Sequence, residues 1–273
     1  MEFIASAIQM ESTDNVEINF DEALRLLNIA VTEQGSNLIV FPENFLCFGT
    51  TQQHYLASNQ HLYLSKFQEI AADLSISIVL GSMPSLIRED GSKTDGRFRS
   101  ASYVINSQGA ICCQYDKINL FDVDVNDSHG QYRESETFEA GSAIKVIEVQ
   151  SAKLGLSICY DLRFPELYQS LRMSGANVLV IPAAFTKVTG HAHWEVLLRA
   201  RAIETQSYVV AANQGGMHSK QRETWGHSMI IDPWGGIVTE IERGAGVCSA
   251  SLDLDKLNEI RASMPLNRNK VSL

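Results

Sequence analysis

Two stretches decide the fold of this chain: GSNLIVFPENF, residues 35–45, and GANVLVIPAAF, residues 175–185. They share Gly, Asn, Val, Pro and Phe at equivalent positions. Each stretch is apolar on consecutive residues, which is typical of a strand that is covered on both faces. The sequence therefore predicts two buried strands of similar design, one in each half of the chain.

The similarity between the halves extends to the segments that follow each stretch. The next matching pair consists of apolar strands, and the third consists of two hairpins with central turns. These segments are SISIVLGSMP (75–84) with SYVVAANQGG (207–216), and ASYVINSQGAIC (101–112) with HSMIIDPWGGIV (227–238). Three matches in the same order predict two related halves, each contributing helices and strands to its own sheet.

Helical patterns alternate with these strands. Residues 15–35 place apolar side chains on one helical face, a second helix is expected around 60–74, and a third follows Phe164, with Pro165 at its start and Gly175 past its end. No Gly/Pro/Ser-rich linker separates the halves. We therefore expect a single domain over residues 1–273, with two packed sheets and the helices outside.

The amino-acid composition and net charge indicate which kinds of molecule the protein is expected to bind. The 273 residues are 45% hydrophobic and 20% charged, as in an ordinary globular protein. Acidic residues outnumber basic ones by 32 to 22, which gives a net charge of −10, and no basic block is present. A nucleic-acid or membrane partner is therefore not expected, whereas a small anionic substrate is compatible with one or two local arginines.

The cysteines and the N-terminal segment indicate the cellular compartment in which the protein is expected. The five cysteines are odd in number and form no CxxC pair. The first residues resemble a strand and not a signal peptide, and no stretch approaches the about 18 apolar residues of a membrane span. We expect a cytoplasmic protein with free thiols.

Cys159 lies in GLSICYDLRFPELY, residues 155–168, where an apolar strand is expected to end near Tyr160 before a helix. At such a turn a thiol is exposed at the sheet edge, near helix N–H groups that lower its pKa. A small buried cysteine is the alternative interpretation. A nucleophilic thiol would also need a base and a group that stabilises an oxyanion.

Glu43 and Lys117 are candidates for those two functions, because each directly follows a strand. Taken singly, either residue could be an ordinary turn residue. Together with Cys159, however, they are expected at the carboxyl ends of strands, which gather side chains into one crevice. The carboxylate would accept the thiol proton, and the ammonium would polarise the substrate carbonyl.

The blocks FPENF, YDKINLFD and GLSICYDLRFPELY resemble, in order and separation, the three signature blocks of the nitrilase (carbon–nitrogen hydrolase) superfamily. The resemblance covers essentially the whole chain and implies an α/β fold, a four-layer α-β-β-α sandwich. It also implies attack by Cys159, proton transfer by Glu43, and an oxyanion held by Lys117 and the Tyr160 backbone N–H. Glu134 matches a fourth polar position and would orient Lys117, unless it is simply one acid in an acidic loop.

The segments around FTKVTGHAHWEVLLRARAIE and TWGHSMIIDPWGG resemble the branch that contains omega-amidase and deaminated glutathione amidase. That resemblance implies that Arg163 binds the substrate carboxylate and that Phe185 and Thr189 line the pocket. An ion pair of Arg163 with Asp161 or Glu166 is the alternative.

GMHSKQRETWGHS looks more like the deaminated glutathione amidases than the omega-amidases. His218 and Arg222 are accordingly hypothesised to contact the far end of a longer substrate, although this segment could equally be an ordinary polar loop. The loop at about 119–141 is long enough to cover the pocket.

The predicted function is a cysteine-dependent amidohydrolase that cleaves a linear carboxylate-bearing amide through a thioester, most similar to deaminated glutathione amidase. Alternatives within the same machinery are an omega-amidase, a nitrilase, an N-carbamoyl hydrolase or an acyltransferase; a catalytically silent scaffold is the non-enzyme alternative. No metal or cofactor is expected, and His191 and His193 are assigned to the start of a helix. The family resemblance implies a homodimer or larger homo-oligomer.

Overall fold

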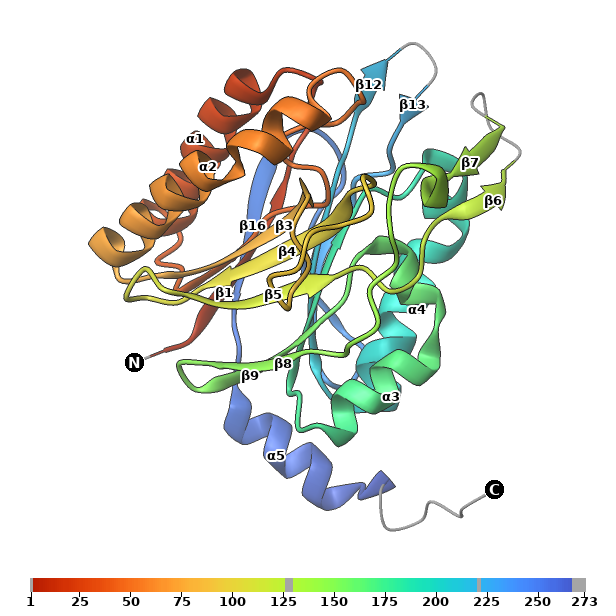
Figure 1. Cartoon of the computed structure of the whole chain (residues 1–273). Coiled ribbons are helices and arrows are strands. Elements are labelled where there is room, and N and C mark those ends of the chain that lie inside the picture. The colour runs from red at the N-terminus through yellow and green to blue at the C-terminus, as the bar shows by residue number, and fades with distance from the viewer. Residues whose placement is uncertain (1, 126–129, 220–221, 267–273) are drawn as a thin grey trace.

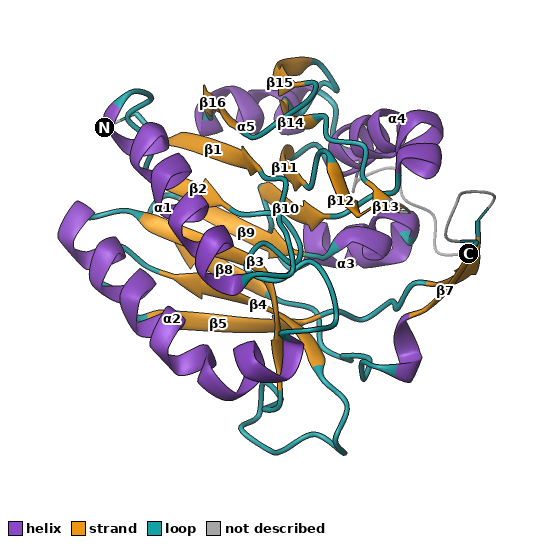
Figure 2. Ribbon diagram, turned by 90° about the horizontal axis from the view of Figure 1, so that it is seen from above, coloured by secondary structure: helices purple, strands orange, loops and turns teal. Residues whose placement is uncertain are grey.

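The computed structural model describes residues 2–125, 130–219 and 222–266. Two six-stranded sheets pack face to face, and helices cover the outer face of each sheet (Figure 1). Seen from above, α1 (Val16–Thr32) and α2 (Gln53–Leu74) lie on one outer side, and α3 (Pro165–Met173) and α4 (Lys187–Thr205) lie on the other (Figure 2). The predicted four-layer α-β-β-α sandwich is confirmed.

The first sheet has the order β16-β1-β2-β3-β4-β5. Strands β1, β2 and β3 are parallel, and β16, β4 and β5 extend the sheet with antiparallel pairing. The bounds are β1 Ile4–Gln9, β2 Leu38–Val40, β3 Ser77–Ser85, β4 Arg99–Ile105, β5 Ile111–Asp116 and β16 Gly246–Ser251.

The second sheet has the order β8-β9-β10-β11-β14-β15. Its parallel centre is β9, β10 and β11, again with antiparallel strands outside. The bounds are β8 Val146–Val149, β9 Ala152–Leu156, β10 Val178–Ala183, β11 Tyr208–Asn213, β14 Ser228–Ile231 and β15 Ile237–Ile241. Because strand order and direction match the first sheet, the two predicted halves are confirmed.

Alternating side chains of each central strand enter different layers. Val40 of β2 and Val180 of β10 belong to one apolar cluster between the sheets. Ile39 and Phe41 point the other way and pack with Phe67 of α2. This two-sided burial is the reason why both stretches are apolar on consecutive residues.

Two predicted boundaries were wrong. The helix expected around 60–74 begins at Gln53. Its first turns lie mostly on the surface and have little apolar periodicity, so the sequence pattern did not indicate them. Strand β9 ends at Leu156 instead of near Tyr160, and a short 3-10 helix, η2 (Cys159–Arg163), separates it from α3. The apolar run therefore continues past the strand into the turn.

Shorter elements surround the carboxyl ends of the parallel strands (Figure 1). They are β6 Asp122–Asp124, β7 Gln131–Arg133, the 3-10 helix η1 Glu134–Glu136, β12 Met217–Ser219 and β13 Arg222–Glu223. The C-terminal helix α5 spans Leu254–Ser263. Among residues 2–125, 130–219 and 222–266, no helix is both long and apolar enough to span a bilayer.

Candidate active site

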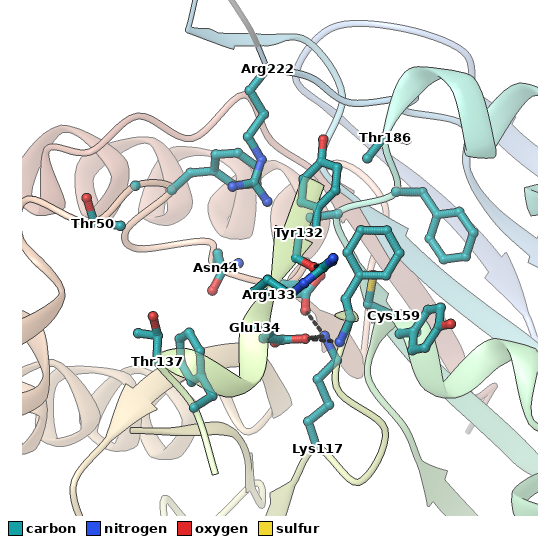
Figure 3. Close-up of a pocket in the computed structure, with 18 of the residues that line it drawn as sticks. Asn44, Thr50, Lys117, Tyr132, Arg133, Glu134, Thr137, Cys159, Thr186 and Arg222 are labelled. Atoms are coloured by element: carbon teal, nitrogen blue, oxygen red, sulfur yellow. Dashed lines mark hydrogen bonds and ion pairs between the residues drawn. The ribbon is translucent and has the colours of Figure 1, made fainter. Parts of the chain in front are cut away.

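An ammonium group bridged by two carboxylates forms the centre of the site. The Lys117 Nζ donates to Glu43 Oε1 at 2.8 Å and to Glu134 Oε1 and Oε2 at 3.0 and 2.9 Å. Lys117 directly follows β5, Glu43 follows β2, and Glu134 begins η1. Three separate segments of the chain thus converge on one nitrogen atom (Figure 3).

Lys117 stays charged despite its burial. The residue is only 2% exposed, and burial alone would lower its pKa. The negative charges of Glu134 and Glu43 outweigh that effect and raise the pKa of Lys117 well above its ordinary value. The ammonium therefore provides a permanent positive charge in a water-poor site, where its electrostatic effect is strong.

The backbone that carries Glu43 passes unusually close to β3. A Cβ atom at Gly81 would lie 2.2 Å from the carbonyl oxygens of both Phe41 and Pro42. Only glycine permits this approach, because real Cβ atoms do not contact backbone at that distance. Gly81 thereby fixes the position of the loop that places Glu43 beside Lys117.

Cys159 lies at a strained turn between β9 and α3. Its φ of +48° is in the left-handed region, which residues other than glycine rarely adopt. The thiol lines the same cavity as Glu43 and Lys117. The surrounding structure must hold such a strained residue in place, as is common at active sites, and Figure 3 shows Cys159 above Lys117.

The expected effect of the turn on the thiol was wrong. Cys159 is 8% exposed rather than open at the sheet edge, and burial raises its pKa well above the ordinary value. The Glu43 carboxylate raises the pKa further, while Lys117 opposes it. Since burial dominates, the resting group is a neutral thiol, and a base must remove its proton during attack.

Asp161 locks the Cys159 turn to the strand that precedes Lys117. Its Oδ2 accepts from the Tyr115 hydroxyl at 2.7 Å and from the Ile158 N–H at 2.9 Å. Its Oδ1 accepts from the backbone N–H and side-chain amide of Asn119 at 2.9 and 2.8 Å. The carboxylate is fully buried and joins segments of both sheets.

Arg163, Phe185 and Thr189 all line the cavity. The Arg163 guanidinium lies 5.3 Å from the centre of the Phe185 ring, and its Nη1 is 3.2 Å from His193 Nδ1. Within the described part of the chain, no carboxylate lies within ion-pair distance of Arg163. The alternative of a pair with Asp161 or Glu166 is therefore wrong, since Asp161 faces its own hydrogen-bond donors instead.

The loop at about 119–141 contributes one wall of the cavity. Phe121, Tyr132 and Phe138 line it, and the Phe121 N–H donates to Glu134 at 2.6 Å. This hydrogen bond and the two bonds to Lys117 hold Glu134 in place. Part of the predicted covering loop, residues 126–129, lies outside the described residues.

Several lining residues escaped prediction from sequence. The cavity, whose volume is about 210 Å³, also contacts Asn44, Phe48, Thr186 and Arg133. Phe48 and Tyr132 carry no local signal, since an aromatic residue in a loop is usually a packing residue. Their closeness in sequence to Glu43 and Glu134 was the one available indication.

His218 and Arg222 have different environments. His218 stacks on Phe48 at 3.8 Å between ring centres, and its two ring nitrogens bond to the Ser12 carbonyl and the Thr224 hydroxyl. Both nitrogens of His218 are engaged within the protein and the residue does not line the cavity, so the structure gives no support to a contact of His218 with substrate. Arg222, by contrast, lines the cavity.

Potential metal ligands are dispersed. Among the described residues, no three His, Cys, Asp or Glu side chains are grouped so that they could hold a metal ion. His191 packs edge-on against Trp225, and His193 lies beside Arg163. Both histidines lie within α4, near its beginning.

The comparisons with known proteins identify the class. The family model described as carbon-nitrogen hydrolase matches residues 4–262. The chain belongs to this family and is a hydrolase of carbon–nitrogen bonds in amides.

Three individual relatives are informative. The chain is 39% identical to the deaminated glutathione amidase of Yersinia enterocolitica, covering 95% of this chain and 90% of that protein. It is 40% identical to the deaminated glutathione amidase of Synechocystis sp., covering 98% of each. Its structure is similar to that of the C. elegans NitFhit protein, with a TM-score of 0.89, 36% identity, and coverage of 98% of this chain and 65% of that longer chain.

Proposed function

We propose that Cys159, Glu43, Lys117 and Glu134 catalyse hydrolysis of a linear amide that carries a carboxylate, through a thioester intermediate. The observation that carries this proposal is the convergence of Glu43 and Glu134 on the Lys117 ammonium in the cavity that also contains the Cys159 thiol. A base, a fixed cation and a thiol in one water-poor cavity are the requirements of nucleophilic amide cleavage.

In the acylation step, Sγ of Cys159 attacks the amide carbonyl carbon while Glu43 accepts the thiol proton. The carbonyl oxygen becomes an oxyanion, which the Lys117 ammonium and the Tyr160 backbone N–H stabilise. Glu43 then gives its proton to the amide nitrogen, the C–N bond breaks, and the amine leaves. The neutral resting state of Cys159 makes the proton transfer to Glu43 an essential part of this step.

In the deacylation step, Glu43 removes a proton from a water molecule, which attacks the thioester carbonyl. The same two donors stabilise the second oxyanion. The C–S bond breaks, the carboxylic acid is released, and the proton returns from Glu43 to Sγ. Glu134 holds no transferring proton in this scheme; it keeps Lys117 oriented through two hydrogen bonds.

The substrate is proposed to be deaminated glutathione. Two features support this: the relatives named deaminated glutathione amidase, and the Arg163 guanidinium, which has no carboxylate partner in the described residues. Arg163 is four residues after Cys159 and belongs to the same 3-10 helix. It would form a two-point ion pair with the carboxylate of the acyl group, above the Phe185 ring.

The direct test is a substrate panel assayed with wild type and Cys159→Ala. The panel contains deaminated glutathione, α-ketoglutaramate, an aliphatic amide, an N-carbamoyl amino acid and a nitrile. We expect Cys159-dependent turnover with deaminated glutathione preferred. Preference for another compound would contradict the proposed substrate and leave the proposed mechanism standing. Turnover of none of the compounds would favour a catalytically silent scaffold.

We also propose a cellular compartment and an oligomeric state for the protein. All five cysteines are free thiols, which supports a cytoplasmic location. A homodimer or larger assembly is proposed from the family resemblance, and Val196 of α4 and Trp234 of the β14–β15 turn, which are 68% and 64% exposed, are candidate contacts. Sedimentation equilibrium would measure the mass; a 30.2 kDa species at micromolar concentration would contradict assembly.

A further inference from the structure

Three arginines line the cavity, and they differ in their partners. Arg133 is paired with Asp124 at 2.8 Å and also donates to two carbonyl oxygens. Neither Arg163 nor Arg222 forms an ion pair with any residue that the structure describes. A protein rarely places two unpaired guanidinium groups in one partly enclosed cavity unless they pair with a ligand.

Arg222 is held by aromatic contacts instead of by a carboxylate. Its guanidinium carbon lies 4.5 Å from the centre of the Phe48 ring and 5.7 Å from that of Tyr132. Phe48 is in turn stacked against His218, whose hydrogen bonds fix the ring. The guanidinium thus rests on a supported aromatic surface while its N–H donors stay available for a ligand.

The two arginines belong to different walls of the cavity. Arg163 lies over Tyr160 and Phe185, on the side formed by η2 and the loop after β10. Arg222 lies over Phe48, in the loop that also carries Glu43. In Figure 3, Arg222 lies at the top of the labelled residues and Lys117 at the bottom, and Cys159 lies between these two levels.

This placement assigns the two arginines to different parts of the substrate. Under the proposed function, Glu43 gives its proton to the departing amine, so the amine leaves along the loop that contains Glu43 and Phe48. The acyl group stays attached to Cys159, beside Arg163. Arg222 therefore faces the leaving amine, and Arg163 faces the acyl group.

We propose that Arg222 binds a carboxylate at the far end of the leaving amine. This inference rests on the proposed function. Deaminated glutathione, the proposed substrate, has such a carboxylate at the end of its leaving amine, so Arg222 would determine specificity at that end. His218 is a positioning residue that fixes the Phe48 ring beneath Arg222.

The test compares two substrates that differ only at this end. One is deaminated glutathione, and the other is its analogue with the terminal carboxylate converted to a carboxamide. Charged hydrogen bonds of this kind predict that wild type prefers the acid by about tenfold to a hundredfold in kcat/KM, mainly through KM. In Arg222→Gln the ratio should fall to about one, and Arg222→Lys should retain part of it.

Lys187→Gln provides the matched control. Lys187 pairs with Glu223, the neighbour of Arg222 on β13, and is half exposed. Its substitution removes one positive charge near the hairpin without touching the cavity, so the acid-to-amide ratio should be retained.

The outcomes separate this inference from the function on which it rests. Cys159-dependent hydrolysis of both compounds with no preference for the acid would overturn the Arg222 site and leave the amidase function standing. An equal loss for both compounds in Arg222→Gln would also overturn it, because the residue would then act on the fold of the hairpin alone. Hydrolysis of neither compound by wild type would overturn the proposed substrate and this site together.

Discussion

At the scale of single residues, the charge balance around Cys159 has an unexpected consequence. The site contains two carboxylates and one ammonium close to a neutral thiol. Burial and the Glu43 charge both act against the thiolate, and Lys117 compensates them only in part. Glu43 therefore has two effects on the proposed nucleophile: its charge disfavours the free thiolate, and its carboxylate accepts the thiol proton when a bound substrate is attacked.

Glu43→Gln should consequently separate two kinds of reactivity. Loss of the base should lower amide hydrolysis by about 10²- to 10⁴-fold. Loss of its negative charge should lower the pKa of Cys159, so the rate of alkylation by a small neutral reagent at pH 8 should rise. Mass spectrometry of Cys159 after timed alkylation measures this rate.

Cys112 supplies the internal reference for that experiment, since it is only half-buried and does not line the cavity. Its alkylation should be the same in wild type and in Glu43→Gln. Slower alkylation of Cys159 in the variant would instead show that the Glu43 carboxylate lowers the pKa of the thiol.

At the scale of secondary structure elements, the site depends on how β5 and η2 are joined. Tyr115 of β5 and Asn119 beyond it both donate to Asp161 of η2. Lys117 lies between these two residues, and Cys159 is two residues before Asp161. The buried carboxylate therefore sets the relative position of the proposed nucleophile and the proposed oxyanion donor.

Asp161→Asn should impair both stability and turnover. An amide group cannot accept from all four donors, so one buried donor loses its partner at a cost of about 1–3 kcal/mol. Displacement of Cys159 against Lys117 should lower kcat by about ten- to a hundredfold, with a smaller effect on KM. Thermal unfolding and steady-state kinetics well below Tm measure the two effects.

Asp95→Asn serves as its control, because Asp95 forms an exposed pair with Arg97 away from the cavity lining and contributes little. If Asp161→Asn lowered Tm while leaving kcat at the wild-type value, the network would have a purely structural role.

At the scale of the whole molecule, the C-terminal segment ties the two sheets together. Strand β16 pairs with β1 in the first sheet, and α5, which follows it, docks beside the second. Arg261 of α5 donates to the carbonyl oxygens of Gln206 and Ala176 and to the Ser207 hydroxyl. These contacts lie at the ends of the strands opposite to the candidate site.

Arg261→Ala should therefore weaken the fold and spare the chemistry. Loss of three hydrogen bonds should lower the free energy of unfolding by about 2–3 kcal/mol. The corresponding fall in Tm is about 5–10 °C for a chain of this size. Calorimetry gives Tm, and kcat/KM at 25 °C should match wild type.

Arg25→Ala is the comparison for this variant, since Arg25 forms an exposed pair with Glu22 within one helix. Its Tm should change by no more than a degree or two. An equally small effect of Arg261→Ala would mean that α5 contributes nothing to holding the sheets together.

Local pattern was sufficient for the architecture. Consecutive apolar residues in 38–41 and 178–181 identify strands that are buried on both faces, and their repetition in order identifies two halves. The same reasoning placed Glu43 and Lys117 just beyond strand ends. These features are predictable because side-chain period and strand order are properties of short segments.

The tertiary structure alone decided the electrostatics and the partners. The raised pKa of Cys159 comes from burial among residues far apart in the chain, which no local pattern reveals. Asp161 and Arg163 are two residues apart, yet one is fully bonded and the other has no carboxylate partner in the described residues. Phe48 and Tyr132 form one wall of the cavity only because their loops meet in space. Sequence thus determined which elements form, whereas long-range packing determined which charges face each other, because burial and Coulomb forces depend on distance in space and not along the chain.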